Sequence, residues 1–198
     1  MDPTRLVLVP FSRSLPRLLA LISVCWVWIS CLVGLVPPAW ASLSDDRYDG
    51  NIFALYAGNG SLVPPSSSLA KAVADHRVAV LVYYLDDSAV SKRFAPVVSE
   101  LQRIWGNRID LIPLVTDPLQ NRPSTGPTDP AAYWNGTIPQ VVVFDRDGQL
   151  VFDASGQVSV DAINSAVSGA TGISLAPGAG SSTSQSFNEL NSEILPSR

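Results

Sequence analysis

Apolar and polar positions divide the chain into an apolar leader, a patterned middle and a polar end. Residues 18–36, "LLALISVCWVWISCLVGLV", are nineteen residues without a charge. From residue 51 onward apolar positions recur at the spacings of strands and helices, and beyond Gly172 glycine and polar residues dominate. We therefore expect an N-terminal signal or transmembrane anchor in residues 1–41, one folded domain in 42–172, and a flexible tail in 173–198.

The strongest strand signal is the unbroken apolar run "VAVLVYYL" at residues 78–85. Such a run is typical of a strand that is covered on both faces, so it predicts the central strand of a sheet. The residues that follow predict a helix, in which Pro96 favours a kink and which Gly106 ends. Its apolar side chains recur every three or four positions, at Phe94, Val97, Val98, Leu101, Ile104 and Trp105.

Weaker patterns predict the remaining elements. They are a short strand in 51–65, a helix in 66–77, a strand in 109–117, two strands in 139–156 joined by a turn at 145–148, and a helix in 158–169 capped by Ser159. Parallel strand–helix–strand units followed by a hairpin indicate an α/β sandwich with a mixed sheet. Residues 118–137 form a long connection, whose Tyr133 and Trp134 either anchor it to the domain or contact a partner.

The leader has the features of a segment that meets a membrane. Residues 18–36 are long enough to span a bilayer, and Arg5, Arg13 and Arg17 precede them, which predicts a cytoplasmic N-terminus and a domain across the membrane. Residues 39–41, Ala-Trp-Ala, also fit a signal cleavage site. The length favours a retained anchor, and a cleaved signal is the alternative.

Composition limits the chemistry of the exported part. Cys25 and Cys31 both lie in the leader, so the domain has no thiol for redox or metal chemistry. From Ser42 onward 10 basic and 16 acidic residues give a charge of −6, which disfavours binding to the phosphate backbone of a nucleic acid. His76 is the sole histidine, and the adjacent carboxylates of residues 86–87 lack supporting histidines. We expect no enzyme activity, cofactor or metal.

Three motifs in order resemble the thioredoxin fold over residues 51–172. In "VLVYYLDDSAVSKRFAPVV", Ser88 and Ser91 fall on the family's two cysteines and Lys92 on its lysine. The second motif is the Ile-Pro of residues 138–139, whose peptide bond is cis in that family, and the third is Gly156 before a closing helix. Because a serine hydroxyl forms neither a thiolate nor a disulfide, we expect a thioredoxin-like α/β domain without dithiol redox activity.

The resemblance also suggests a binding site. Asp87 replaces the family's loop tryptophan, and Val82 its buried acid. We expect Ser88 to cap the following helix by accepting backbone N–H groups. In that family a groove beside the Ile-Pro turn receives an extended peptide. Here that groove is predicted to be lined by Tyr84, Asp86, Asp87, Ser88, Ser91, Lys92, Ile138 and Pro139. A loop that binds nothing is the alternative.

Two longer stretches, "DGNIFALYAGNGSLVPP" and "YWNGTIPQVVVFDRDG", resemble the cyanobacterial thylakoid thioredoxin-like family associated with photosystem I accumulation. That resemblance implies a non-redox assembly factor at the thylakoid membrane. Its domain would lie on the lumenal side, and its partners would be photosystem I subunits or assembly intermediates. Two alternatives stand beside it: a relative of thiol–disulfide oxidoreductases, and a peptide-binding module of the periplasm or plasma membrane.

Overall fold

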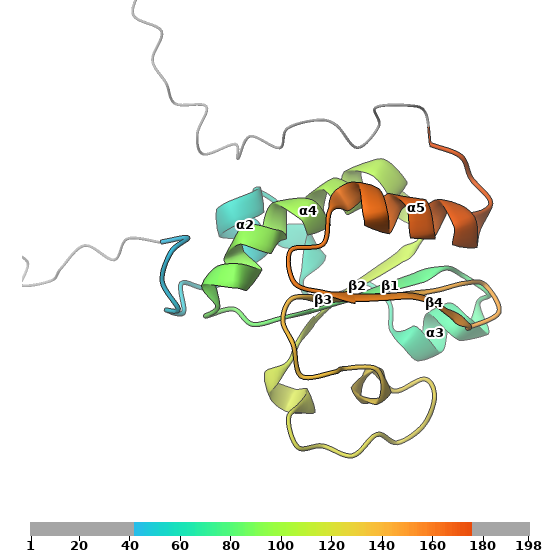
Figure 1. Ribbon diagram of the computed structural model, residues 1–198, viewed down its shortest axis with the longest axis horizontal. Helices are drawn as coiled ribbons and strands as arrows, with labels where there is room; N and C mark the ends of the chain where they lie inside the picture. Colours follow the sequence, from blue (N-terminus) through green and yellow to red (C-terminus); the bar gives the residue numbers. More distant parts are fainter. Residues whose placement is uncertain (1–41, 176–198) are drawn as a thin grey trace, which may run out of the picture. The chain divides into compact units, whose positions relative to one another are not determined.

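A four-stranded mixed sheet forms the centre of the computed structural model, which describes residues 42–175 (Figure 1). The strands are β1 (Ala79–Tyr84), β2 (Asp110–Val115), β3 (Gln140–Phe144) and β4 (Leu150–Ser155), in the order β2-β1-β3-β4. β1 is parallel to β2 and antiparallel to β3, and β3 and β4 form an antiparallel hairpin. Every residue of β1 is buried, so the predicted central strand is confirmed.

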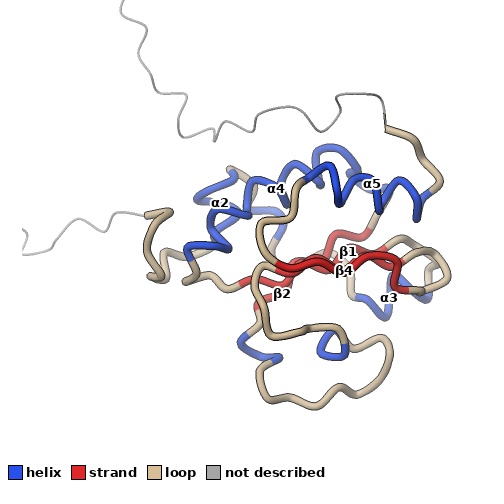
Figure 2. Tube along the Cα trace, viewed as in Figure 1, coloured by secondary structure: helices blue, strands red, loops and turns tan. Residues whose placement is uncertain are grey.

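Helices cover both faces of this sheet, as Figures 1 and 2 show. On one face lie α2 (Ile52–Ala57), α4 (Ala89–Trp105) and α5 (Val160–Thr171), and on the other lie α3 (Leu69–Ala74) and the long connection between β2 and β3. Alternate residues of β1 belong to the two core clusters: Val80, Val82 and Tyr84 pack with α2, α4 and α5, and Ala79, Leu81 and Tyr83 pack with α3. The alternation follows from the pleat of the strand.

The first predicted strand, in residues 51–65, is wrong: this stretch forms α2 and a short 3-10 helix at Gly60–Leu62. The Asn51 side chain caps α2 by accepting from the backbone N–H groups of Phe53 and Ala54, and Gly58 ends it with a φ of 61°. Ile52, Phe53 and Tyr56 are buried, which is a helical spacing. Among the described residues, the sheet therefore begins at β1.

Local signals located the other elements correctly. α4 continues through Pro96 and ends at Gly106, and α5 is capped by the Ser159 hydroxyl, which accepts from the backbone N–H of Ala162. In the β3–β4 turn, the Asp145 carboxylate accepts from the backbone N–H groups of residues 147 and 149. Each of these signals lies within a few residues of the structure that it determines.

The ends of the chain were predicted to hold an anchor and a tail. Residues 1–41, including the predicted span at 18–36, and residues 176–198 lie outside the described residues. Between residues 42 and 175 no helix is long and apolar enough to cross a bilayer. Ile173 and Leu175, which were predicted to begin the tail, are half-buried and pack against the core.

The long connection is an ordered loop that is built around one carboxylate. Asp129 accepts hydrogen bonds from the Arg122 guanidinium at 2.6 and 2.9 Å, from the backbone N–H and hydroxyl of Thr125 at 2.9 Å, and from the backbone N–H of Ala131 at 3.0 Å. The Arg122 ion pair holds the pKa of Asp129 well below its usual range. Asp129 therefore ties the residues before it, Arg122 and Thr125, to Ala131, which follows it.

Aromatic side chains attach this connection to the sheet. The Tyr133 ring packs edge-on against Phe144 with a centroid distance of 4.7 Å, and Trp134 also packs against the core cluster on that face. The buried Tyr83 hydroxyl donates to the carbonyl of Pro130 at 2.7 Å. Of the two alternatives for Tyr133 and Trp134, the structure thus supports anchoring onto the domain.

Replacing Asp129 by alanine is expected to loosen this loop and leave the sheet intact. The N–H groups of Thr125 and Ala131 lose their acceptor, so their hydrogen exchange should become at least about tenfold faster, while exchange in β1 stays unchanged. Asp117→Ala, at the start of the same connection, is the control and should leave both amides protected. Unchanged protection in Asp129→Ala would show that the aromatic anchors alone order the loop.

Candidate functional site

Two chain segments meet at one end of the central strands β1 and β3 and form the candidate site. Because Tyr83 of β1 pairs with Gln140 of β3 in antiparallel register, residues 85–88 after β1 lie beside residues 138–139 before β3. The Ile138–Pro139 peptide bond is cis, as the thioredoxin resemblance implies. The Pro139 carbonyl accepts from the backbone N–H of Gly156 at 2.8 Å, which ties this turn to the end of β4. We call residues 85–88 and 138–139 the loop edge.

The eight residues predicted to line a groove lie in or next to this loop edge, but they differ in exposure. Five are buried: Tyr84, Ser88, Ser91, Lys92 and Pro139. Asp86 and Ile138 are half-buried, and Asp87 is exposed. The part of the predicted groove that a partner can reach in this structure is therefore formed by Asp86, Asp87 and Ile138.

The two serines at the cysteine positions have different structural roles. The Ser91 hydroxyl accepts from the backbone N–H of Leu85 at 3.1 Å and so closes the loop onto the first turn of α4. The prediction that the Ser88 side chain caps α4 is wrong, because it makes no capping hydrogen bond. The Asp46 carboxylate caps the helix instead, accepting from the backbone N–H of Ala89 at 2.7 Å. A carboxylate forms the stronger bond at the positive end of a helix dipole.

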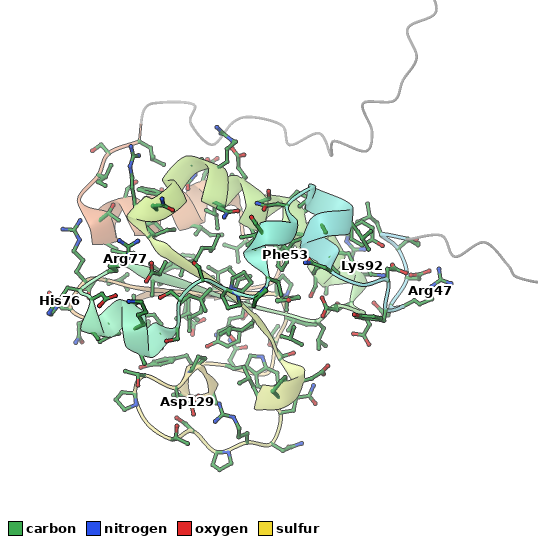
Figure 3. All side chains as sticks on the ribbon, turned by 180° about the vertical axis from the view of Figure 1, so that it is seen from behind. Arg47, Phe53, His76, Arg77, Lys92 and Asp129 are labelled. Carbon is green, nitrogen blue, oxygen red and sulfur yellow. The ribbon has the colours of Figure 1, made fainter. Side chains whose placement is uncertain are left out.

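Lys92 is fully buried beneath residues 42–49, which we call the lead strap (Figure 3). Its ammonium donates to three strap carbonyls, those of Ser42 at 3.2 Å, Asp45 at 3.1 Å and Arg47 at 2.6 Å. It also forms an ion pair with the Asp49 carboxylate at 2.6 Å. Oxygen atoms of the strap thus replace the water around this ammonium, which makes its burial tolerable.

Asp49 is the acidic centre of this contact. Its carboxylate accepts from Lys92 and from the Tyr56 hydroxyl, each at 2.6 Å, and these bonds lower its pKa to about 2. Because the folded-state pKa lies below the ordinary value of 3.8, Asp49 stabilises the folded strap fully above about pH 4. That contribution is lost as the pH falls through about 2. Burial alone would lower the pKa of Lys92, but the Asp49 hydrogen bond raises it.

The exposed part of the loop edge is acidic. Partial burial raises the pKa of Asp86, and the charges of Asp87 and Asp117 raise it further. No Lys or Arg of residues 42–175 forms an ion pair with these three carboxylates. Leu85 and Ile138, both half-buried, are the apolar residues of the loop edge. The edge therefore offers negative charge and apolar contact to a partner.

Other predicted polar residues lie apart from this edge. His76 is exposed, has its Nδ1 atom 3.2 Å from the carbonyl of Arg146, and lies at the opposite end of the domain from Lys92 (Figure 3). Within the described residues no group of three His, Cys, Asp or Glu side chains could hold a metal ion. Sequence reasoning missed Asp46, Asp49 and Tyr56, because only the acidic composition of the lead marked this region.

Comparison with known proteins finds a relative by sequence and several solved structures with a similar fold. No family model matches the chain. The chain is 36% identical over 157 residues to "Thylakoid membrane protein slr1796" of Synechocystis sp. (strain ATCC 27184 / PCC 6803 / Kazusa), and the match covers 79% of this chain and 78% of the relative.

Similar solved structures include two thioredoxins. The exposed lipoprotein thioredoxin Etrx1 of Streptococcus pneumoniae is 15% identical, with a TM-score of 0.40 over 52% of this chain and 95% of its own. A mutant thioredoxin of Halobacterium salinarum is 21% identical, with a TM-score of 0.39 over 55% and 88%. The strand order and the cis Ile-Pro turn themselves define a thioredoxin-like fold here. By its identity to slr1796, the chain belongs to the family of that thylakoid membrane protein.

Proposed function

We propose that this protein supports the accumulation of photosystem I at the thylakoid membrane through protein contacts at the loop edge, without redox chemistry. One observation carries the proposal: the loop edge keeps a thioredoxin-like frame, while Ser91, at a cysteine position, forms a hydrogen bond that closes the loop. The name of the relative supports a thylakoid membrane location. The role in photosystem I accumulation is supported by the resemblance of residues 49–65 and 133–148.

The chemistry of the edge defines the kind of partner segment that fits. Asp86 and Asp87 favour Lys or Arg side chains, and Ile138 favours an apolar side chain next to them. An extended segment of a photosystem I subunit or assembly intermediate that presents such residues on the lumenal side would meet both requirements. The domain would be held near that partner by residues 18–36 as a retained anchor.

The proposal is tested by the ratio of photosystem I to photosystem II in a strain that lacks the gene. We expect a lower ratio in the deletion strain and a normal ratio after return of the native gene. An unchanged ratio in the deletion strain would remove the photosystem assignment. Fractionation then separates the thylakoid location from the periplasmic alternative, and an insulin-reduction assay of the purified chain tests the oxidoreductase alternative.

A further inference from the structure

The lead strap is attached to the domain mainly by polar contacts. Its two large apolar or aromatic side chains, Leu43 and Tyr48, are 44% and 69% exposed, and the side chain of Asp49, which is only 8% exposed, is charged. Apolar burial is the main source of free energy that fixes a segment to a folded core. Opening the strap would therefore expose little apolar surface, in contrast to opening α2, whose Ile52 and Phe53 are buried.

The polar contacts of the strap converge on a small part of the domain. Ser42, Asp45, Arg47 and Asp49 all bond to the ammonium of Lys92, and Asp46 bonds to the N–H of Ala89, one turn earlier in α4. The Tyr56 hydroxyl adds a bond to Asp49. Because one cation holds four residues, loss of its contacts releases most of the strap at once.

The open state of the strap is compatible with a folded domain. Lys92 and the strap carboxylates would regain water, which offsets much of the lost ion-pair energy. The side chains beneath the strap are Lys92 of α4 and Tyr56 of α2, and the apolar face of α4 stays packed through Phe94, Val98 and Leu101. Local opening at a lower free energy than global unfolding is expected for a segment with few buried apolar contacts.

We propose that residues 42–49 are a latch that opens without unfolding of the domain and uncovers Lys92 and the N–H of Ala89 beside the loop edge. The latch regulates access to the α4 side of the loop edge. This role of the latch rests on the proposed function, which takes the loop edge as the binding surface. In the closed state the ammonium is neutralised inside the chain, so the edge presents Asp86 and Asp87 to a basic partner. In the open state the uncovered ammonium and helix N-terminus would oppose the same partner.

Tryptic cleavage after Arg47 in the full-length chain tests this latch. The Arg47 side chain is 59% exposed, but a protease needs several neighbouring residues to leave the domain, so cleavage measures opening of the strap. We expect cleavage after Arg47 in Lys92→Met to be at least about tenfold faster than in the native chain. The matched control is Arg77→Met, which removes the ion pair with Asp110 on another part of the domain and should leave this rate unchanged.

If Lys92→Met fails to fold, the urea dependence of tryptic cleavage after Arg47 in the native chain tests the latch instead. Opening of a short latch exposes little surface, so cleavage after Arg47 should depend only weakly on urea, and cleavage inside the domain strongly. An equal, strong dependence at both places would overturn the latch, as would equal rates in the native chain and a folded Lys92→Met. These rates involve no partner, so their failure is distinguishable from an unchanged photosystem ratio.

Discussion

Replacing Phe53 by alanine is expected to lower the free energy of unfolding by about 3–5 kcal/mol. Phe53 is 1% exposed, and its ring packs edge-on against Tyr84 of β1 with a centroid distance of 4.9 Å. The substitution leaves a cavity between α2 and the sheet that the surrounding side chains fill only in part. Urea denaturation followed by circular dichroism measures the loss.

The neighbouring substitution Ala54→Ser is the matched control, because Ala54 lies on the exposed side of the same helix. It should change the stability by less than about 0.5 kcal/mol. A loss below about 1 kcal/mol in Phe53→Ala would contradict the place of α2 in the core.

Placing an acid at Val82 is expected to destabilise the domain by at least about 3 kcal/mol at pH 8. Val82 is fully buried in the central strand and packs among apolar side chains, so a carboxylate there would have to lose its water. Burial would raise the pKa of the new acid above its unfolded value. The loss should therefore be smaller at pH 5, where the folded state can hold the acid protonated, and should grow as the pH rises.

Val82→Asn is the control for this prediction, because asparagine has nearly the same shape as aspartate but does not titrate. It should destabilise the domain by the same amount at both pH values. Urea denaturation of both variants at pH 5 and pH 8 makes the comparison. A stability of Val82→Asp that is native-like at pH 8, or that does not change with pH, would show that the core can hydrate or pair an acid at this position.

The features that the sequence predicted correctly are those with local causes. β1 followed from a continuous apolar run, α4 from apolar spacing and Gly106, and the hairpin from Asp-Gly at residues 147–148. The strand predicted in residues 51–65 is wrong, because the apolar residues of this short segment fit either a strand or a helix. The Asn51 cap and tertiary packing, rather than an intrinsic preference, decide for the helix.

The least predictable part of the candidate site is the lead strap. Its bonds to α4 join residues 43 to 50 positions apart, for example Asp46 with Ala89 and Ser42 with Lys92. No periodic pattern marks such contacts, since one carboxylate or carbonyl in a loop looks like any other. The thioredoxin resemblance placed Lys92 in a groove, whereas the strap, an irregular segment without such a pattern, buries it.

The serines explain how the frame of a redox loop persists without thiols. Ser91 holds the loop by accepting the N–H of Leu85, and the role at the helix start that was predicted for Ser88 belongs to Asp46. Both bonds are structural and need no change of oxidation state. The loop edge is thus stable as a surface, which is what the proposed function requires.

The central claim is that the exposed loop edge carries the function, and one matched pair of variants tests it most directly. Asp87 and Asp147 are both exposed, each in a turn that follows a strand, and the antiparallel register of β1 and β3 places them at opposite ends of the sheet. We would measure the photosystem I to photosystem II ratio in strains whose native gene is replaced by Asp87→Lys or by Asp147→Lys, at equal protein levels. We expect the ratio to fall with Asp87→Lys as in the deletion strain and to stay native with Asp147→Lys. A native ratio with Asp87→Lys in a strain background where the deletion lowers it would contradict the claim.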